Sequence, residues 1–131
     1  MTIPAVDRFD VVVLGAGPGG AAITHSLVRR GLSVALVDPR LGHSWHQTLG
    51  SWVDDLDPCD DSLVLKGLAR ATWPIVRVVC VREHELSRRY LVFDNDALRS
   101  HLIGIGLRPI AERAISVVDR FDHDGFHREV G

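Results

Sequence analysis

The sequence predicts an α/β fold that begins with a parallel βαβ unit, and three observations between residues 10 and 38 predict it. The apolar run Val11 to Leu14 is typical of a strand buried on both faces. A glycine-rich turn, residues 15–20 (GAGPGG), follows and opens an amphipathic segment. A second apolar run contains Val34, Leu36 and Val37 and ends in a carboxylate. A strand, a helix and a second strand therefore account for this part of the chain.

Three glycines of the glycine-rich turn each have a mechanical role in binding a dinucleotide. Gly15 allows a tight turn off the strand, Gly17 leaves room for a pyrophosphate, and Gly20 allows close packing of helix and sheet. The backbone N–H groups that open the helix face the phosphates, with the positive end of the helix dipole behind them. Asp38 ends the second strand, where a carboxylate accepts hydrogen bonds from both ribose hydroxyls. We therefore predict a Rossmann-type FAD/NAD(P)-binding unit.

The helix between the two strands is expected to run from the glycine turn to Gly31, which supplies a left-handed cap. Ala21, Ile23 and Leu27 are expected on its inner face, and Thr24 stands where such helices usually carry alanine. A glycine-rich turn that binds nothing is the alternative for the whole motif.

The residues around Asp38 limit which nucleotide the site is expected to bind, but they do not identify it. A carboxylate repels a 2′-phosphate and so disfavours NADP, although the neighbouring Arg40 keeps that ligand open. The motif alone does not separate FAD from NAD.

Composition indicates one ordinary globular domain of 131 residues with a formal net charge of −2, which gives no reason to expect a nucleic acid partner. Cys59 and Cys80 lack CxxC spacing, so we expect reduced thiols in a cytoplasmic protein, with Cys80 in a strand core. The apolar run near the start is interrupted by glycines, which argues against a signal peptide or a membrane-spanning helix.

The segment after Asp38 is expected to contain a long loop, a helix and a hairpin. Residues 39–58 are expected to form the loop, with one short helical turn. Residues 60–62 (DDS) are suited to cap a helix that carries Leu63, Leu65, Leu68 and Ala69. Residues 75–81 and 88–93 are predicted to be the two strands of a β-hairpin joined near residues 82–85.

The last third of the chain is expected to contain a helix and further strands. Asp94 or Asn95 is suited to cap a helix that ends around residues 104–106 and carries Leu98, Leu102 and Ile103. A β-rich segment follows, with Ile110, Ile115, Val117 and Val118 apolar. Residues 123–125 (HDG) form a turn signal between two short polar strands.

Three tryptophan-bearing segments follow the glycine motif in a recognisable order. This arrangement resembles the amino-terminal third of the plant-type lycopene β-cyclases, flavoproteins of carotenoid biosynthesis, over residues 10–103. One departure is at the helix start, where Asn95 or Asp96 stands near a position at which that family commonly has arginine, with Arg99 one turn later. The matching segments are Trp45, the Gly-x-Trp-x-Asp motif at residues 50–54, the Thr-Trp-Pro motif at residues 72–74, and Arg88-Arg89-Tyr90.

The resemblance implies FAD as the cofactor, with Gly15, Gly17, Gly20 and Asp38 around its ADP half. It also implies a polyene substrate, lycopene, whose ends are cyclised without net redox change, and peripheral contact of the enzyme with a membrane. Residues 1–131 would then be a partial FAD-binding domain, truncated before the sheet and the substrate domain are complete. The catalytic residues stay unknown, because the family's acidic motif lies further along, and a second polypeptide would complete the fold.

Two other functions remain open, namely a fragment of a different FAD enzyme (a monooxygenase, an epoxidase or a prenyl reductase) and an inactive relic. Asp54 and Asp55 beside Trp52 are candidate general acids, since an apolar neighbour raises the pKa of a carboxyl group, although a solvated loop is the favoured interpretation. His43 and His46 lack a third ligand, so no metal is expected.

The tryptophans are interpreted equally as groove lining or core anchors. Several arginines are interpreted as a solvated strand face, with phosphate contact as the alternative: Arg77, Arg82, Arg88 and Arg89.

Overall fold

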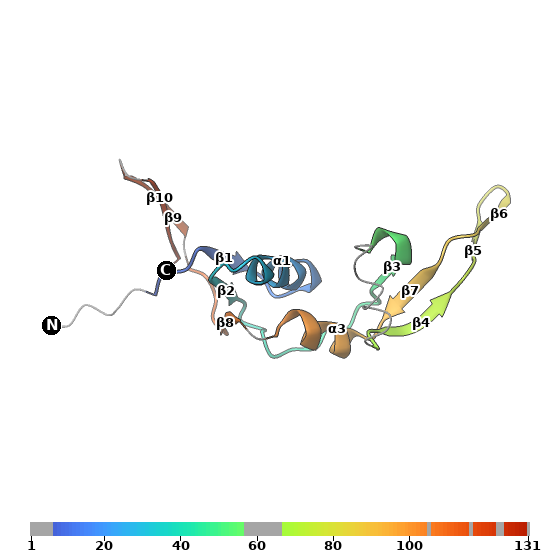
Figure 1. Cartoon of the computed structure of the whole chain (residues 1–131), viewed down its shortest axis with the longest axis horizontal. Coiled ribbons are helices and arrows are strands. Elements are labelled where there is room, and N and C mark those ends of the chain that lie inside the picture. The colour runs from blue at the N-terminus through green and yellow to red at the C-terminus, as the bar shows by residue number, and fades with distance from the viewer. Residues whose placement is uncertain (1–6, 57–66, 105, 116, 123–124, 131) are drawn as a thin grey trace. The chain divides into compact units, whose positions relative to one another are not determined.

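A computed structural model of the chain describes residues 7–56, 67–104, 106–115, 117–122 and 125–130. The chain divides into two compact units, residues 1–43 with 102–131 and residues 44–101. Figure 1 labels their helices and strands. Each unit is described by itself below.

The first unit contains a three-stranded parallel sheet, which confirms the predicted α/β fold. Its strands are β1 (Val11–Leu14), β2 (Val34–Val37) and β8 (Leu107–Ile110), in the order β1-β2-β8. The central strand β2 is buried at all four of its residues, as expected for a continuous apolar run between two neighbours. Helix α1 (Pro18–Arg29) connects β1 to β2, so the βαβ unit is present with the predicted boundaries.

Helix α1 buries small side chains, and the prediction that Ile23 lies on its inner face is wrong. Ala21 and Thr24 are completely buried, whereas Ile23 is 56% exposed and Leu27 is half-buried. The helix starts so close to β1 that a Cβ atom on Gly20 would lie 1.9 Å from the carbonyl oxygen of Gly15. Successive helix residues are rotated by about 100°, so Ile23 lies well away from the face on which Ala21 and Thr24 are buried.

The end of α1 agrees with the prediction for Gly31, which has a φ of +82°. The N–H of Gly31 donates to the carbonyl of Val28 (2.9 Å), and the N–H of Leu32 donates to the carbonyl of Leu27 (3.3 Å). These two bonds are the pair that defines a Schellman cap, which satisfies carbonyls that the helix leaves free.

Two further strands complete the first unit, β9 (Val117–Asp122) and β10 (Gly125–Val130). They pair in antiparallel fashion, with Gly125 opposite Asp122, so two strands flank the predicted turn. Residues 123 and 124 of that turn lie outside the described residues.

The second unit is built around an antiparallel sheet of order β3-β7-β4. At its centre Leu91 is completely buried. Strand β7 continues into helix α3, and β4 continues into a two-stranded ribbon formed by β5 and β6 (Figure 1). The elements are β3 (Gly50–Trp52), the 3₁₀ turn η1 (Val53–Asp55), β4 (Ala69–Trp73), β5 (Val76–Val79), β6 (Glu83–Leu86), β7 (Tyr90–Phe93) and α3 (Asn95–Leu102).

The structure contains a β-hairpin, but the predicted pairing of residues 75–81 with residues 88–93 is wrong, and the turn lies earlier in the chain than expected. Strand β5 pairs with β6, while β7 pairs with β3 and β4. The N–H of Cys80 donates to the carbonyl of Arg82 (3.1 Å), so the residues expected to connect the strands begin the return strand. The sequence hides β6 because none of its four residues is buried, so burial imposes no alternation of polar and apolar side chains. Cys80 is exposed at this turn, which corrects its expected place in a strand core.

Two other expectations for the second unit have different outcomes. Ala69 begins strand β4 and Leu68 precedes it, so the helix expected to reach these two residues does not, and its other positions lie outside the described residues. Helix α3 is confirmed: the Oδ1 atom of Asp94 accepts a bond from the N–H of Ala97 (2.9 Å), and Leu98 is buried. The expected short helical turn is η1, while strand β3 was not predicted.

Candidate nucleotide-binding site

The glycine-rich turn leaves β1 in a conformation that requires glycine. Gly15 has a φ of +101°, and its N–H donates to the carbonyl of Val37 at the end of β2 (2.8 Å). Its carbonyl oxygen occupies the space that a side chain on Gly20 would need. A Cβ atom on Gly17, by contrast, would meet nothing within 4 Å, and Gly17 is exposed. The turn is therefore closed on the side of the sheet and open at Gly17.

Helix α1 begins at this open side. Gly17 is its N-cap residue and provides no side-chain cap, and Pro18 at the first helical position has no N–H. The carbonyl of Gly17 accepts the N–H of Ala21 (2.9 Å). The N–H groups of Gly19 and Gly20 belong to the first turn, which has no acceptor within the helix. With the positive end of the helix dipole, these amides are suited to an anion such as a phosphate.

Asp38 is tied to the glycine turn by its side chain. Its Oδ2 atom accepts the N–H of Ala16 (2.8 Å), and its Oδ1 atom accepts the N–H of Arg40 (2.7 Å). The bond from Ala16 and then that from Arg40 hold the pKa of Asp38 below its usual range, against a smaller opposing effect of burial. Asp38 is therefore a charged acceptor. A carboxylate has about four lone-pair positions, so about two remain for hydroxyl donors.

All four residues that the sequence analysis selected lie at one edge of the sheet. Strands β1 and β2 are parallel, with Leu14 opposite Val37, so the turn after β1 and the carboxylate after β2 meet at their carboxyl ends. Ligands of open α/β sheets bind at this edge. The bond from the amide of Ala16 was not foreseen, since a backbone N–H leaves no signal in the sequence.

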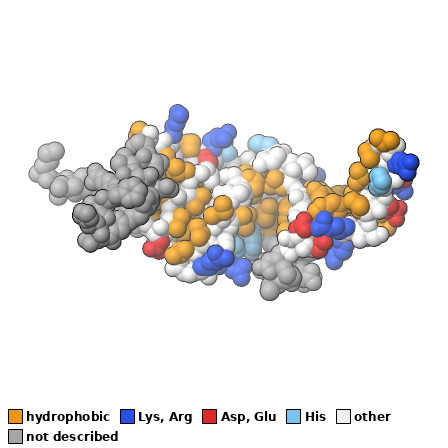
Figure 2. Space-filling model, turned by 90° about the horizontal axis from the view of Figure 1, so that it is seen from above, with side chains coloured by type: hydrophobic (Ala, Val, Ile, Leu, Met, Phe, Trp, Pro, Cys, Tyr) orange, Lys and Arg blue, Asp and Glu red, His pale blue; other side chains and the backbone are white. Residues whose placement is uncertain are grey.

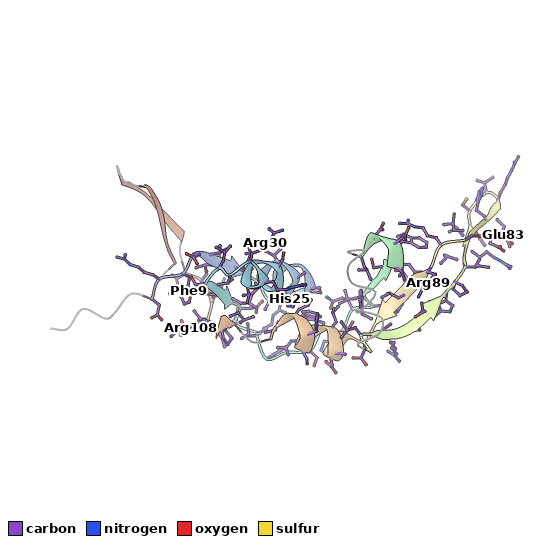
Figure 3. All side chains as sticks on the ribbon, viewed as in Figure 1. Phe9, His25, Arg30, Glu83, Arg89 and Arg108 are labelled. Atoms are coloured by element: carbon purple, nitrogen blue, oxygen red, sulfur yellow. The ribbon has the colours of Figure 1, made fainter. Side chains whose placement is uncertain are left out.

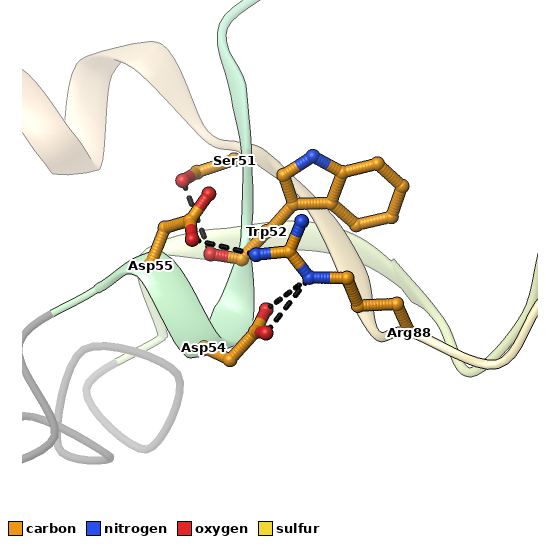
Figure 4. A network of polar contacts seen from close by, with 5 residues as sticks. All are labelled: Ser51, Trp52, Asp54, Asp55 and Arg88. Carbon is orange, nitrogen blue, oxygen red and sulfur yellow. Dashed lines mark hydrogen bonds and ion pairs between the residues drawn. The ribbon is translucent and has the colours of Figure 1, made fainter.

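A second cluster of polar contacts lies in the other unit, around Arg88 (Figure 4). The Nε atom of Arg88 donates to both carboxylate oxygens of Asp54 (2.9 and 2.7 Å), and its Nη2 atom donates to Oδ1 of Asp55 (2.6 Å). The guanidinium lies 4.7 Å from the centre of the Trp52 ring, which packs edge-on against Tyr90 at 5.1 Å. The Gly-x-Trp-x-Asp segment is thereby fastened to the segment that precedes β7.

These contacts decide the role of the candidate acids. The hydrogen bond from Arg88 holds the pKa of Asp54 below its usual value. A general acid needs the opposite shift, so Asp54 does not meet the requirement. Asp55 is an ion-pair partner of the same arginine, and Arg88 is therefore engaged by carboxylates rather than available to a phosphate.

The tryptophans have three different surroundings. Trp52 is half-buried in the cluster just described, Trp73 is 47% exposed at the end of β4, and Trp45 lines a hollow of about 520 Å³. The side-chain amide of Asn95 donates to the carbonyls of Trp45 and Gln47 (2.8 Å each), which fixes one wall of that hollow. Neither the lining nor the anchor interpretation therefore fits all three rings. Within the part of the chain that the structure describes, no group of three or more potential ligands could hold a metal ion.

The fold and the glycine turn define a Rossmann-type unit like those of FAD-dependent oxidoreductases. A geranylgeranyl bacteriochlorophyll reductase-like protein of Thermoplasma acidophilum matches 88% of this chain and 33% of its own, with a TM-score of 0.66 and 17% identity. A putative FAD-containing monooxygenase of Photorhabdus luminescens matches 92% of this chain and 36% of its own, with a TM-score of 0.52 and 18% identity. At these identities the likeness shows the fold alone.

Sequence comparison gives the family. The model of the family described as lycopene cyclase protein matches residues 10–128, so the chain belongs to the lycopene cyclase family. A lycopene beta cyclase of an Oncidium hybrid is 30% identical over 83% of the chain, and an uncharacterized carotenoid cyclase of Deinococcus radiodurans is 33% identical over 73%. The matched region covers 24% and 22% of those two proteins, so the chain spans about a quarter of their length. The resemblance seen in the tryptophan-bearing segments is thus confirmed.

Within the described residues, no helix is long and apolar enough to cross a membrane.

Proposed function

We propose that this chain is the FAD-binding amino-terminal portion of a lycopene-cyclase-like flavoprotein that cyclises the ends of lycopene without net redox change. The observation that carries the proposal is the bond from the N–H of Ala16 to Asp38. This bond holds the charged Asp38 carboxylate against the turn whose amides suit phosphates, where the carboxylate would accept ribose hydroxyls. Membership of the lycopene cyclase family supports the reaction.

The residues present fit the ADP half of FAD. Gly17 is open to solvent where a pyrophosphate would approach, and a side chain there would intrude on the ligand rather than on the protein. Gly15 and Gly20 allow the close turn that places the helix amides next to it. Asp38 would accept the ribose hydroxyls and, as a charged group, would repel a 2′-phosphate. These four residues are the proposed cofactor site.

The flavin, when bound, would stabilise cationic character or exchange a proton during ring closure. This chain would bind the nucleotide, through its helix amides and the Asp38 carboxylate. The proton donor is proposed to lie in the part of the family fold that this chain does not span, because the pKa of Asp54 is shifted the wrong way. Activity therefore needs the remainder of the fold, from a second polypeptide or a longer chain, at a membrane surface reached from the cytoplasm.

A different FAD enzyme is the second candidate, because the solved structures that share the fold include a reductase-like protein and a putative monooxygenase. Such an enzyme would couple substrate turnover to oxidation of NAD(P)H. Cyclisation would leave a reduced nicotinamide unchanged over time.

The cofactor proposal is tested by calorimetric titration of the 131-residue chain with FAD, with NAD as competitor. Asp38→Ala should weaken FAD binding about tenfold or more, since two charge-assisted hydrogen bonds to the ribose are lost. Asp10→Ala is the matched control, because Asp10 precedes β1 and also accepts two hydrogen bonds, at the opposite edge of the same two strands. It should leave FAD affinity unchanged.

Circular dichroism of each variant separates loss of the site from loss of the fold. Failure of the folded wild-type chain to bind FAD would overturn the cofactor proposal. Equal weakening by both substitutions would show that Asp38 acts through stability rather than by contact with the ribose.

A further inference from the structure

The β5–β6 ribbon carries a concentration of exposed apolar side chains at its turn. Six of the nine large apolar side chains that are exposed among the described residues lie between residues 73 and 86, so they form a cluster rather than a scatter. The most exposed are Val79 at 73% and Val81 at 98%, and Val78 is also exposed. We name residues 78–81 (VVCV) the apolar tip. In Figure 2 apolar side chains gather at the end of this ribbon, with charged groups beside them.

The apolar tip presents hydrophobic groups in more than one direction. Val78 pairs with His84, and Val79 pairs with Glu83. Neighbouring residues of a strand point to opposite faces, so Val78 and Val79 lie on different faces of the ribbon. Val81 follows in the turn. A groove in a protein would cover one face of a two-stranded ribbon, whereas the interface of a lipid bilayer would surround its end on every side.

Peptide groups of the tip are hydrogen-bonded within the ribbon, which lowers the cost of moving them out of water. The N–H of Cys80 donates to the carbonyl of Arg82 (3.1 Å), and the Cys80 thiol lies 3.5 Å from the same oxygen. Below the turn, β5 and β6 pair along their whole length, from the pair Val79–Glu83 to the pair Val76–Leu86. Because an unpaired peptide group is costly in an apolar medium, a turn closed by its own hydrogen bond reduces the cost of insertion.

Charged residues lie beside the apolar tip, in its turn and on the opposite strand. Arg82 follows Val81 directly, and Arg77 forms an exposed ion pair with Glu83 (2.9 Å). Figure 3 labels Glu83 near the end of the ribbon. Arginine side chains extend their charge towards headgroups while their stems stay in the apolar layer. Arg82 is exposed in the turn next to Val81, at the end of the ribbon where an anionic headgroup would approach.

We propose that the apolar tip inserts into the interfacial layer of a lipid bilayer that contains anionic headgroups, with Arg82 at the headgroup level. The inference is independent of the cofactor, since the ribbon lies in the second unit and the glycine turn in the first. It assigns a specific surface to membrane contact and goes beyond the proposed reaction.

The test is co-sedimentation of the 131-residue chain, without FAD, with vesicles of phosphatidylcholine alone or mixed with phosphatidylglycerol. The wild type should bind the mixed vesicles, and Val81→Asp should reduce partitioning about tenfold or more, because it places a charge at the most exposed apolar position. Ile115→Asp is the matched control, since Ile115 is 88% exposed in the other unit, and it should bind like the wild type. Arg82→Gln should lower binding to the mixed vesicles and leave the weaker binding to phosphatidylcholine alone unchanged.

A second variant reports on insertion directly. Because the chain has three tryptophans of its own, the signal is the difference between Val81→Trp and the wild type: the added emission should shift to the blue on the mixed vesicles and be quenched by lipids brominated in their acyl chains. Three results would overturn the proposal: no binding by the folded wild-type chain, equal loss in Val81→Asp and Ile115→Asp, or self-association in the absence of lipid that Val81→Asp abolishes. The last result would identify the tip as an interface between copies of the chain.

Discussion

The two ends of the β1–β2 pair each carry one aspartate, and the aspartates are used differently. At the amino edge, Asp10 and Ser33 bond to each other: Oδ2 of Asp10 accepts both the N–H and the hydroxyl of Ser33 (2.7 Å each), and the N–H of Asp10 donates to the Ser33 carbonyl (3.0 Å). At the carboxyl edge, Asp38 divides its two oxygens between the N–H groups of Ala16 and Arg40. The first arrangement closes on itself, while the second spans an open turn.

The difference shows how one parallel pair of strands separates stability from binding. Ser33 supplies both side-chain and backbone donors to Oδ2 of Asp10, so this end ties the two strands together. Asp38 keeps acceptor capacity on both oxygens and lies against amides that have no partner within the helix. The carboxyl edge is therefore less self-contained, as a site for a ligand must be.

The largest effect is expected from Gly20, which sets the distance between α1 and β1. Gly20→Ala places a Cβ atom 1.9 Å from the backbone oxygen of Gly15, and backbone cannot move aside as a flexible side chain would. We expect a loss of more than about 2 kcal/mol in the free energy of unfolding, measured by urea denaturation. Gly19→Ala is the control: its Cβ would meet nothing within 4 Å, so stability should stay the same or rise by about 0.5 kcal/mol. An equal change in the free energy of unfolding in the two variants would contradict this, because it would show that the turn can widen to accommodate a Cβ atom on Gly20.

A smaller effect is expected from Thr24, which lies on α1 between the two edges. Its side chain is completely buried, and its Oγ1 atom has no hydrogen-bond partner among the described residues. Thr24→Val keeps the shape and removes the unpaired hydroxyl, so stability should rise by about 1 kcal/mol. Thermal unfolding measures the change, and a fall in the unfolding temperature would contradict it. FAD affinity should not change, because this position is remote from Gly17.

The smallest effect is a pH dependence that the two aspartates share. Hydrogen bonds hold the pKa of Asp10 and of Asp38 below the value of 3.8 that each would have in the unfolded chain. Because the folded pKa is the lower one, each group contributes stability that is fully present well above pH 3.8 and is lost as the pH falls through the folded pKa. Denaturation midpoints measured from pH 7 down to pH 3 should therefore fall less steeply in Asp10→Asn and Asp38→Asn. Unchanged slopes in either variant would show that its carboxylate has the same pKa folded and unfolded.

A bound nucleotide should separate the two aspartates in the same experiment. With the same excess of FAD, the Asp38→Asn profile should gain less stabilisation from the ligand than the wild type does, whereas the Asp10→Asn profile should gain as much.

The sequence predicted those parts of the fold whose backbone conformation depends on residues close together in the chain. Gly31 at a positive φ, the Asp94 cap of α3 and the continuous apolar run of β2 each act within a few residues, so the sequence alone locates them. The error at Ile23 arose because hydrophobicity was weighed above the rotation of the helix, which turns Ile23 away from the face that buries Ala21 and Thr24. Strand β6 was missed because neither of its faces is buried.

Contacts between distant segments were out of reach of the sequence. Arg88 and Asp54 are 34 positions apart, and their ion pair reverses the pKa shift that the neighbouring Trp52 had suggested. Gly15, Gly17, Gly20 and Asp38 lie together at one edge of the sheet, because parallel strands bring their carboxyl ends together. Their role in binding FAD stays a prediction until the titration is done.

The bond between Asp38 and the amide of Ala16 also limits how the nucleotide preference of this unit could change during evolution. In many nucleotide sites a basic residue in place of the acid admits a 2′-phosphate. Here that single substitution would also remove the acceptor that holds Ala16 in the phosphate turn. The first mutational step would thus cost order in the turn before any new ligand was gained. If the unit binds FAD as proposed, a lineage that changed its nucleotide would first need a compensating acceptor at the turn, so single substitutions at Asp38 would be selected against.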